Sequence, residues 1–432
     1  MHDCLYISEI VSRVCTELRL GSLAPKARGQ KGFCFGDIAR LARTCHALRD
    51  PALDALWHTL PSLAPLVRTL PADLWEEREA AEDEYGNTNR EIVLLRLVEE
   101  SDWARFAVYA PRVRALNYCD NSRWGGRAVF LDAGTTAALY TSAPKHLHLP
   151  NLLSIALDEE DPDHLLSNIA VLAHPDVASL TLKYPDDDLD SRIALLMALP
   201  AAFPALTCLA VDRSRGSVCE GDDPRITAAL TKVIGACTRL ETLRVTGLTP
   251  SALHAVATLP SLRALTVLSH VHMDFDTQHP PSLHTYPHSQ QPFPALRALA
   301  LLNPPPDAAT AFLSLLPRIH ALTDVEIYAP AHPPHRPEPW RALFEALAKH
   351  SSLVRVVVQG NFYADGSEAA SGGDMLAIIS PLLAFHRLEK LHVTLPLAVD
   401  LDDASRTDIA TAHGWDTQHP PVETGYGPLA GR

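Results

Sequence analysis

A short pattern of apolar and polar positions recurs along most of the chain. In the stretch FPALRALAL, Leu296, Leu299 and Leu301 are separated by two residues and then by one. Ten copies of this spacing occur, and their starts lie 22 to 39 residues apart. The apolar positions of the copies are Val113/Leu116/Tyr118, Leu152/Ile155/Leu157, Val177/Leu180/Leu182, Leu206/Leu209/Val211, Leu240/Leu243/Val245, Leu262/Leu265/Val267, Leu296/Leu299/Leu301, Leu322/Val325/Ile327, Leu353/Val356/Val358 and Leu388/Leu391/Val393.

The spacing predicts one strand in each copy. Side chains alternate between the two faces of a strand, so the last two apolar residues of a copy lie on the same face. A repeated strand–turn–helix unit of this length predicts an α/β solenoid of about ten strands over residues 103–412, with parallel strands inside and helices outside. Two segments between copies carry apolar residues at helical spacing, namely Ile226/Leu230/Val233/Ile234/Cys237 and Trp340/Leu343/Phe344/Leu347.

The residue between the last two apolar positions of a copy must point to the other face of its strand. In a solenoid this is the concave face, which can accept a protein or a peptide. The polar residues at this position form a candidate partner-binding face: Asn117, Thr181, Arg244, Thr266, Glu326 and His392.

Acidic residues follow two of the predicted strands. Because both groups lie on connections that leave strand ends, we expect them to gather on one rim of the sheet. Such a rim is either a solubilising edge or a surface that attracts basic segments. Its residues are Asp158, Glu159, Glu160, Asp186, Asp187 and Asp188.

Residues 1–72 follow a helical pattern instead of the repeat. A first amphipathic helix is followed by a glycine-rich segment at 21–36, which predicts a flexible loop. A second helix has Leu41 on its apolar face, and Pro51 is predicted to open a third. The apolar residues of the first helix are Leu5, Ile7, Ile10, Val11, Val14, Cys15 and Leu18, and those of the third are Leu53, Leu56, Trp57 and Leu60.

Two further segments complete the organisation. Residues 73–102 contain the acidic run LWEEREAAEDE and then Ile92, Leu95 and Val98 at helical spacing, which predicts an acidic linker and a connecting helix. Residues 413–432 are rich in proline and glycine and poor in apolar residues, which predicts a disordered tail.

The segments CLYISEIVSRVC and DIARLARTCHALRDPALDALWHTLPSLAPLVRTLP resemble an F-box domain of the type frequent in mushroom-forming (basidiomycete) fungi. Ser8 stands where the family motif usually has proline, and the segment 21–36 lengthens the gap after the first helix. Residues 103–400 resemble leucine-rich repeats. The F-box resemblance implies three short helices that dock the Skp-type adaptor of a cullin–RING ubiquitin ligase. Carried onto this chain, the adaptor-binding residues are Leu5, Ile7, Ile10, Val11, Val14, Leu41, Pro51, Leu53, Leu56 and Trp57.

Two functions are compatible with this organisation. In the first, the chain is the substrate-recognition subunit of an SCF-type ubiquitin ligase, and the repeats bind a substrate protein. In the second, the chain is a leucine-rich-repeat interaction scaffold without ligase association. The N-terminal helices could also act as a cap on the end of the solenoid, since terminal repeats need a polar outer face.

The composition limits the classes of binding partner and the cellular compartment that we expect. The net charge of −14 and the pI near 5.8 disfavour nucleic acid and anionic membrane surfaces as partners. The eight cysteines are scattered and form no CxxC, which favours reduced thiols in the cytoplasm or the nucleus. The charged N-terminal residues do not resemble a signal peptide.

No sequence motif indicates catalysis. The chain has 21 histidines, but its close pairs, such as His146 with His148, have no cysteine or carboxylate at metal-ligand spacing. The sequence contains no GxSxG, P-loop or GxGxxG motif. We therefore expect a protein that is not an enzyme and that uses no metal or cofactor.

Overall fold

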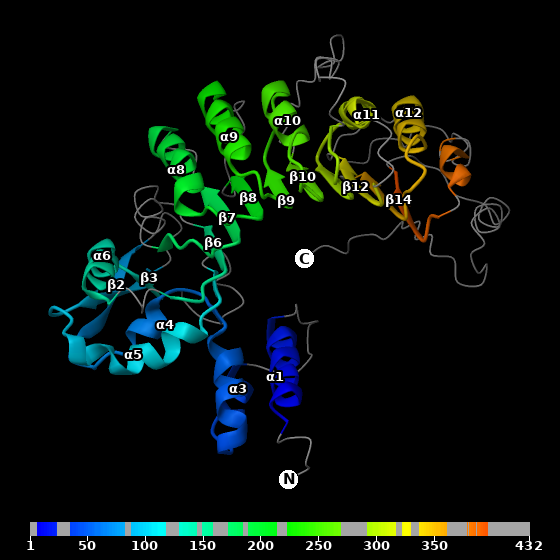
Figure 1. Cartoon of the computed structure of the whole chain (residues 1–432). Coiled ribbons are helices and arrows are strands. Elements are labelled where there is room, and N and C mark those ends of the chain that lie inside the picture. The colour runs from blue at the N-terminus through cyan, green and yellow to red at the C-terminus, as the bar shows by residue number, and fades with distance from the viewer. Residues whose placement is uncertain are drawn as a thin grey trace. The chain divides into compact units, whose positions relative to one another are not determined.

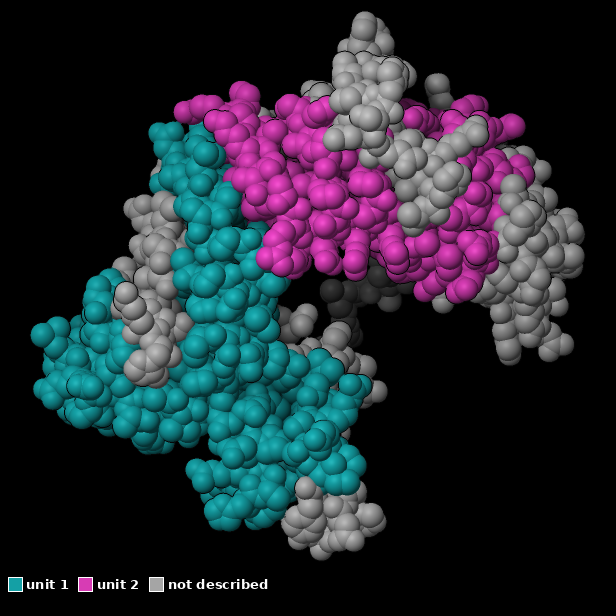
Figure 2. All heavy atoms as spheres, in the orientation of Figure 1, with its two compact units in different colours: residues 1–206, 213–215 teal, residues 207–212, 216–432 magenta. Residues whose placement is uncertain are grey.

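The computed structural model divides into two compact units, which are coloured separately in Figure 2. Unit 1 comprises residues 1–206 and 213–215, and unit 2 comprises residues 207–212 and 216–432. The predicted domain boundaries at 72 and 102 both lie within unit 1. The structure describes residues 7–23, 35–82, 88–117, 129–144, 149–158, 172–184, 189–213, 223–268, 292–316, 322–329, 337–360, 378, 380–385 and 387–395. The predicted tail at 413–432 lies outside these residues.

The main sheet has eleven parallel strands, and their order in the sheet is their order in the chain. Ten of these strands coincide with the ten copies of the apolar pattern. The strands that belong to unit 1 are β1 (Thr59–Leu60), β4 (Ala115–Asn117), β6 (Ser154–Asp158) and β7 (Ser179–Tyr184). The others are β8 (Cys208–Arg213), β9 (Thr242–Val245), β10 (Ala264–Leu268), β11 (Ala298–Leu302), β12 (Asp324–Ala329), β13 (Arg355–Gly360) and β14 (Lys390–Thr394).

The apolar positions of the copies form the core of each unit. Leu296, Leu299 and Leu301 are at most 1% exposed, and every described apolar position in the other copies is also buried. The intervening positions of β10, β11 and β12 alternate with the buried ones and are half-buried. In unit 2 the helices line one side of the strands (Figure 1), so each strand has one covered face and one open face. These helices are α9 (Pro224–Ala236), α10 (Pro250–Ala257), α11 (Pro306–Leu315) and α12 (Pro337–Leu347).

A repeated hydrogen-bond arrangement sets the register between neighbouring strands. The carbonyl of Arg263 accepts from the N–H groups of Arg297 and Ala298, at 2.8 and 2.9 Å. The carbonyl of Arg297 accepts in the same way from Thr323 and Asp324, at 2.8 and 3.0 Å. Each accepting carbonyl belongs to the residue just before a strand, and the two N–H groups lie at the start of the next strand. Neighbouring strands therefore begin in register. The same doubly accepting carbonyl occurs at His58, Arg114, Leu153, Thr207, Glu241, Thr323 and Val354.

Strand β1 is a further copy that the apolar pattern does not reveal. Its Leu60 is in register with Leu116 of β4, which places Trp57, Leu60 and Ser62 at the three core positions. Ser62 is 4% exposed, and its hydroxyl donates to the Val129 carbonyl at 2.7 Å and accepts from the Ala64 N–H at 3.2 Å. These two hydrogen bonds let a polar residue occupy a buried position. The main sheet thus begins within the region predicted as a separate helical domain.

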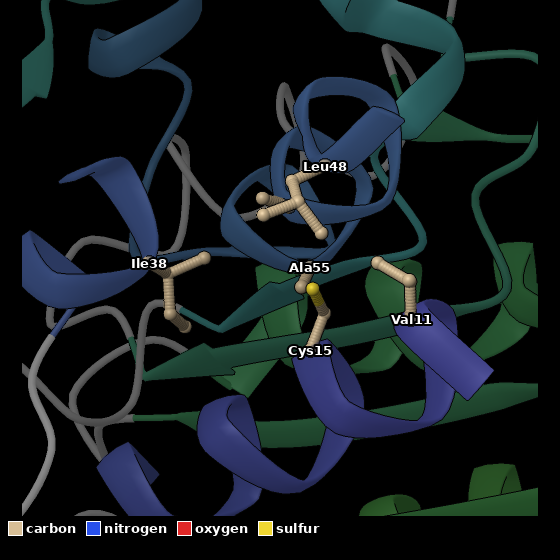
Figure 3. Packing of buried hydrophobic residues seen from close by; sticks show 6 residues of the cluster. Val11, Cys15, Ile38, Leu48 and Ala55 are labelled. Atoms are coloured by element: carbon tan, nitrogen blue, oxygen red, sulfur yellow. The ribbon is translucent and has the colours of Figure 1, made fainter. Parts of the chain in front are cut away.

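The N-terminal helices α1 (Ser8–Leu23), α2 (Phe35–Leu41) and α3 (His46–Trp57) form a small cluster around Val11, Cys15, Ile38 and Leu48 (Figure 3). The prediction that Pro51 opens the third helix is wrong, because α3 begins at His46 and Pro51 lies inside it. Leu48, Ala52 and Ala55 are buried on one face of α3. The packing of this face extends the helix across Pro51, even though a proline has no N–H for the helical hydrogen bond.

Residues 73–102 do not form the predicted linker and helix. They contain the strands β2 (Trp75–Glu82) and β3 (Thr88–Leu94), which pair antiparallel, and β3 also pairs parallel with β5 (Val129–Leu131). Ile92 is fully buried, whereas Leu95 is 50% exposed, so the apolar spacing here does not mark a helical face. The acidic run is compatible with a strand because Glu77 pairs with Arg68 and with Arg90.

Short helices complete unit 1 and the end of unit 2. Helix α5 carries Trp103 and Phe106, which are buried and packed edge to face with ring centroids 5.0 Å apart. The remaining elements are α4 (Ala64–Val67), η2 (Glu100–Asp102), α5 (Trp103–Tyr109), η3 (Ala110–Arg112), α6 (Ala133–Ser142), α8 (Leu189–Ala202) and η7 (Ser380–Ala384).

Candidate partner-binding surfaces

The predicted partner-binding face lies on the open side of the strands. In unit 1, Asn117, Ala156 and Thr181 occupy one register row on β4, β6 and β7. In unit 2 the corresponding row crosses every strand from β8 to β14, and its neighbours are in register at each step. All six predicted residues are therefore at equivalent positions within their units. The row in unit 2 is Ala210, Arg244, Thr266, Ala300, Glu326, Val357 and His392.

Polar side chains on β12 and β13 are linked around Glu326. Its carboxylate forms an ion pair with Arg355 at 2.7 Å and accepts a hydrogen bond from the Tyr328 hydroxyl at 3.3 Å. Burial, and then the charge of Glu326, raise the pKa of the Tyr328 phenol. The phenol therefore stays a neutral donor at physiological pH. These contacts hold the three side chains in place before any partner arrives.

A second linked group follows on β13 and β14. The Nε2 atom of His392 lies 2.7 Å from the Gln359 amide nitrogen and 3.4 Å from the Thr394 hydroxyl. Near the other end of the row, Arg244 on β9 forms an ion pair with Asp212 at 3.1 Å. The polar groups at both ends of the row are thus joined across neighbouring strands.

Between these polar groups, β10 and β11 present small and apolar side chains. Thr266 and Ala300 lie side by side in the row, and Leu268 and Leu302 are paired two residues further along the strands. All four are half-buried. An apolar centre with hydrogen-bonding borders is the composition of a protein–protein interface. We name this surface, from Arg244 to His392, the sheet face.

Three polar residues of the sheet face were missed by the sequence reasoning: Tyr328, Arg355 and Gln359. Each lies two residues from a position between the last two apolar residues of a copy. The two-residue period of a strand therefore places each on the same face as the predicted residues. The sequence contained this information, but the prediction used only one position in each strand.

The acidic rim is not assembled by the described residues. Asp158 is the last residue of β6. The other five predicted residues, at 159–160 and 186–188, lie outside the described part of the chain. Asp212, the acidic residue that follows the fourth copy, is 8% exposed and forms an ion pair with Arg244.

The predicted adaptor-binding residues of the first helix divide into two groups. Val11 is 2% exposed and belongs to the cluster shown in Figure 3, whereas Ile10 and Val14 are 40% and 45% exposed. Ile7, just before α1, is 47% exposed. Leu5 lies outside the described residues. The three exposed residues, Ile7, Ile10 and Val14, form what we name the α1 stripe.

The remaining predicted adaptor-binding residues have internal contacts. Leu41 and Leu56 pack against the cluster formed by α1, α2 and α3. Pro51 and Leu53 are half-buried on α3. The indole of Trp57 stacks on Tyr109 of α5, with the ring centroids 4.4 Å apart and the planes inclined by 25°. The structure therefore joins the third helix to the elements that follow it.

Histidines do not form a metal centre among the described residues, where no three His, Cys, Asp or Glu side chains lie together in a suitable group. His350, which follows α12, is 2% exposed, and its Nδ1 atom has no hydrogen-bond partner within the described structure. Burial lowers the pKa of His350, and a hydrogen bond with the Leu313 backbone opposes this shift only in part.

This buried histidine predicts a pH dependence of stability. The neutral imidazole is favoured in the folded state, so the unfolded chain binds a proton more readily as the pH falls below about 6.5. The stabilisation is therefore complete above that pH and is lost as the pH falls toward the lowered folded-state pKa of His350. A series of urea denaturations between about pH 7.5 and pH 5 should show wild type losing more stability than His350→Gln. Equal losses in the two proteins would contradict this assignment.

Comparisons with known proteins identify no relative. A scan against models of protein families gives no match, and a search of curated proteins finds none with significant similarity to the chain. Within the described residues, no helix has both the length and the apolar character needed to cross a membrane.

Proposed function

We propose that the chain is a non-catalytic substrate-recognition subunit of an SCF-type cullin–RING ubiquitin ligase. The N-terminal helices would dock the Skp-type adaptor, and the strands would form a leucine-rich-repeat solenoid whose concave face binds a substrate protein. The α1 stripe is the observation that carries this proposal. It supports the proposal together with the resemblance of residues 2–75 to an F-box domain.

The apolar arc of α1 is wider than its intramolecular contacts require. Val11 and Cys15 are 2% and 1% exposed and face α3, while Ile10 and Val14 lie beside them on the helix and remain in solvent. Exposed apolar residues three and four positions apart form one stripe on a helix. An amphipathic helix that presents such a stripe binds in an apolar groove on a partner.

The repeated strands support the second half of the proposal. Nine described steps along the chain use the same doubly accepting carbonyl, and the strands follow one another in sequence order. Repeating units that contact their neighbours in this way make extended binding surfaces. The sheet face, with its apolar centre and linked polar borders, is where the substrate protein would bind.

Binding of the adaptor is tested by substitutions in the α1 stripe. The double variant Ile10→Asp and Val14→Asp should no longer co-purify with the adaptor, because two carboxylates would have to enter an apolar groove. Leu20→Asp is the matched control, since Leu20 is 48% exposed on the same helix but is rotated by about 120° from Val14. Val11 is unsuitable, because a carboxylate at this buried position would disrupt the helical cluster.

Circular dichroism should show that the double variant and the control are both folded. Adaptor binding by the folded double variant would rule out the α1 stripe as the docking surface. Failure of the wild-type chain to bind any Skp-type adaptor would rule out the ligase function altogether.

The internal contacts of Leu41, Leu56 and Trp57 favour a second candidate function. These residues stabilise the chain itself and leave only part of the predicted adaptor surface in solvent. In this alternative, the chain is a leucine-rich-repeat interaction scaffold, and its N-terminal helices cap the first strand of the sheet. A wild-type chain that binds a substrate through the sheet face, but binds no adaptor, would support the scaffold.

A further inference from the structure

A turn that follows β3 displays two leucines outside the apolar cores. Leu97 is 85% exposed and Leu95 is 50% exposed. Both belong to residues 95–99, which we name the Leu97 turn. Other exposed large apolar residues, such as Val108 and Met197, are 52% and 47% exposed and lie within helices. The turn thus places an almost fully solvated leucine on non-helical backbone.

The Leu97 turn is held in place by the side chain between its leucines. Arg96 donates to both oxygens of Asp102, at 2.7 and 3.1 Å, and to Asp73 at 3.0 and 3.1 Å. It also donates to the carbonyl of Leu97 at 3.0 Å. The Arg96 side chain therefore links the turn to Asp102 of η2 and to Asp73, which lies two residues before β2.

The backbone on either side of the turn is also fixed. The Leu95 N–H donates to the Leu74 carbonyl at 2.8 Å, and the Glu99 N–H donates to Asp102 at 2.9 Å. Glu99 and Asp102 form a reciprocal capping box at the start of η2. An apolar side chain on a backbone that is already ordered loses little entropy on binding, which is the property of an interface anchor.

The charge around the turn defines the partner. Residues 95–102 carry Glu99, Glu100 and Asp102 against the single arginine Arg96, a net charge of −2, and Asp73, which binds Arg96, adds one more negative charge. Glu99 and Glu100 lie two and three residues after Leu97 and are exposed, and Asp73 has 69% of its side chain exposed. The leucines are thus flanked by negative charge, which repels acidic proteins and anionic membranes and attracts cations.

We propose that the Leu97 turn is a docking site for a basic amphipathic helix of a partner protein. Leu95 and Leu97 pack on the apolar stripe of that helix, and the surrounding carboxylates face the lysines and arginines that border the stripe. The site shares no residue with the α1 stripe or the sheet face, and it does not depend on ubiquitin-ligase function.

The proposal is tested with a synthetic helix of leucine and lysine that carries one apolar stripe. Its binding to the full-length chain is measured by fluorescence anisotropy over a series of salt concentrations. Leu97→Ser should weaken binding by about tenfold or more, because interface anchors contribute on this scale. Glu100→Lys should weaken binding and reduce its salt dependence. Leu153→Ser, which changes a 46% exposed leucine elsewhere, should have no effect.

A scrambled peptide of the same composition separates docking from charge attraction. It keeps every lysine but lacks the stripe, so it should bind weakly and with equal affinity to wild type and to Leu97→Ser. Equal affinity of the striped peptide for wild type and Leu97→Ser would overturn the proposal. Equally tight binding of the striped and scrambled peptides would also overturn it, because the leucines would then contribute nothing.

Discussion

Replacing Leu299 with asparagine is expected to unfold unit 2 or to bring it to the edge of unfolding. Leu299 is 1% exposed at the middle core position of β11. Truncating a buried leucine costs about 2–5 kcal/mol, and an amide buried without partners adds about 1–3 kcal/mol. The sum is comparable with the whole stability of an ordinary domain, about 5–15 kcal/mol. Urea denaturation followed by circular dichroism would measure the loss.

The neighbouring residue provides the matched control. Ala300 lies in the same strand but on the half-buried open face, so Ala300→Asn should change stability by no more than about 0.5 kcal/mol. The two variants carry the same new side chain one position apart. Similar stabilities would show that the register of β11 is not the one described here.

The strands of the main sheet could be predicted because each carries its own pattern. Leu296, Leu299 and Leu301 face the core, and the same spacing recurs wherever a strand must bury one face and expose the other. The helices α9 and α12 were also predicted, since apolar residues such as Ile226 and Trp340 recur at helical spacing and are buried. Local periodicity is sufficient for elements that are buried on one side.

Two elements were missed because long-range contacts replace the local pattern. Strand β1 is followed by Ser62 at a core position, and the Val129 carbonyl that accepts from the Ser62 hydroxyl lies 67 residues away. Strand β2 has almost no apolar residues, and its Glu77 pairs with Arg68 and Arg90 from other segments. A short window of the sequence contains neither the hydrogen bond from Ser62 to Val129 nor the ion pairs of Glu77.

The sheet face was predicted in part. Glu326 and His392 were placed correctly because alternation along a strand is a local property. Their contacts with Arg355 and Gln359 depend on which residues of the next strand lie opposite, and the backbone hydrogen bonds between strands decide this. The division of α1 into buried Val11 and exposed Val14 likewise depends on the position of α3. Apolar spacing alone assigns both residues to one face.

In unit 1, aromatic and charged contacts connect α3 with the elements that follow it. Trp57 stacks on Tyr109, and Arg112 binds Asp54, the Asp50 carboxylate at 2.8 Å and the Asp50 carbonyl at 3.3 Å. These contacts join α3 to α5 and η3. Trp57→Ala should destabilise this connection by about 2–3 kcal/mol, because a large aromatic contact is lost from a half-buried site.

Hydrogen exchange would locate this destabilisation. Amides of α1, α2 and α3 should exchange faster in Trp57→Ala, since the helices can then open without unfolding the main sheet, while those of β9 to β14 keep their protection. Tyr109→Phe is the control, because it keeps the stacked ring and removes only the hydroxyl. Unchanged exchange in α3 of Trp57→Ala would mean that the charged contacts of Arg112 hold the helices without the stack. The variant Arg112→Ala should then produce the accelerated exchange on its own.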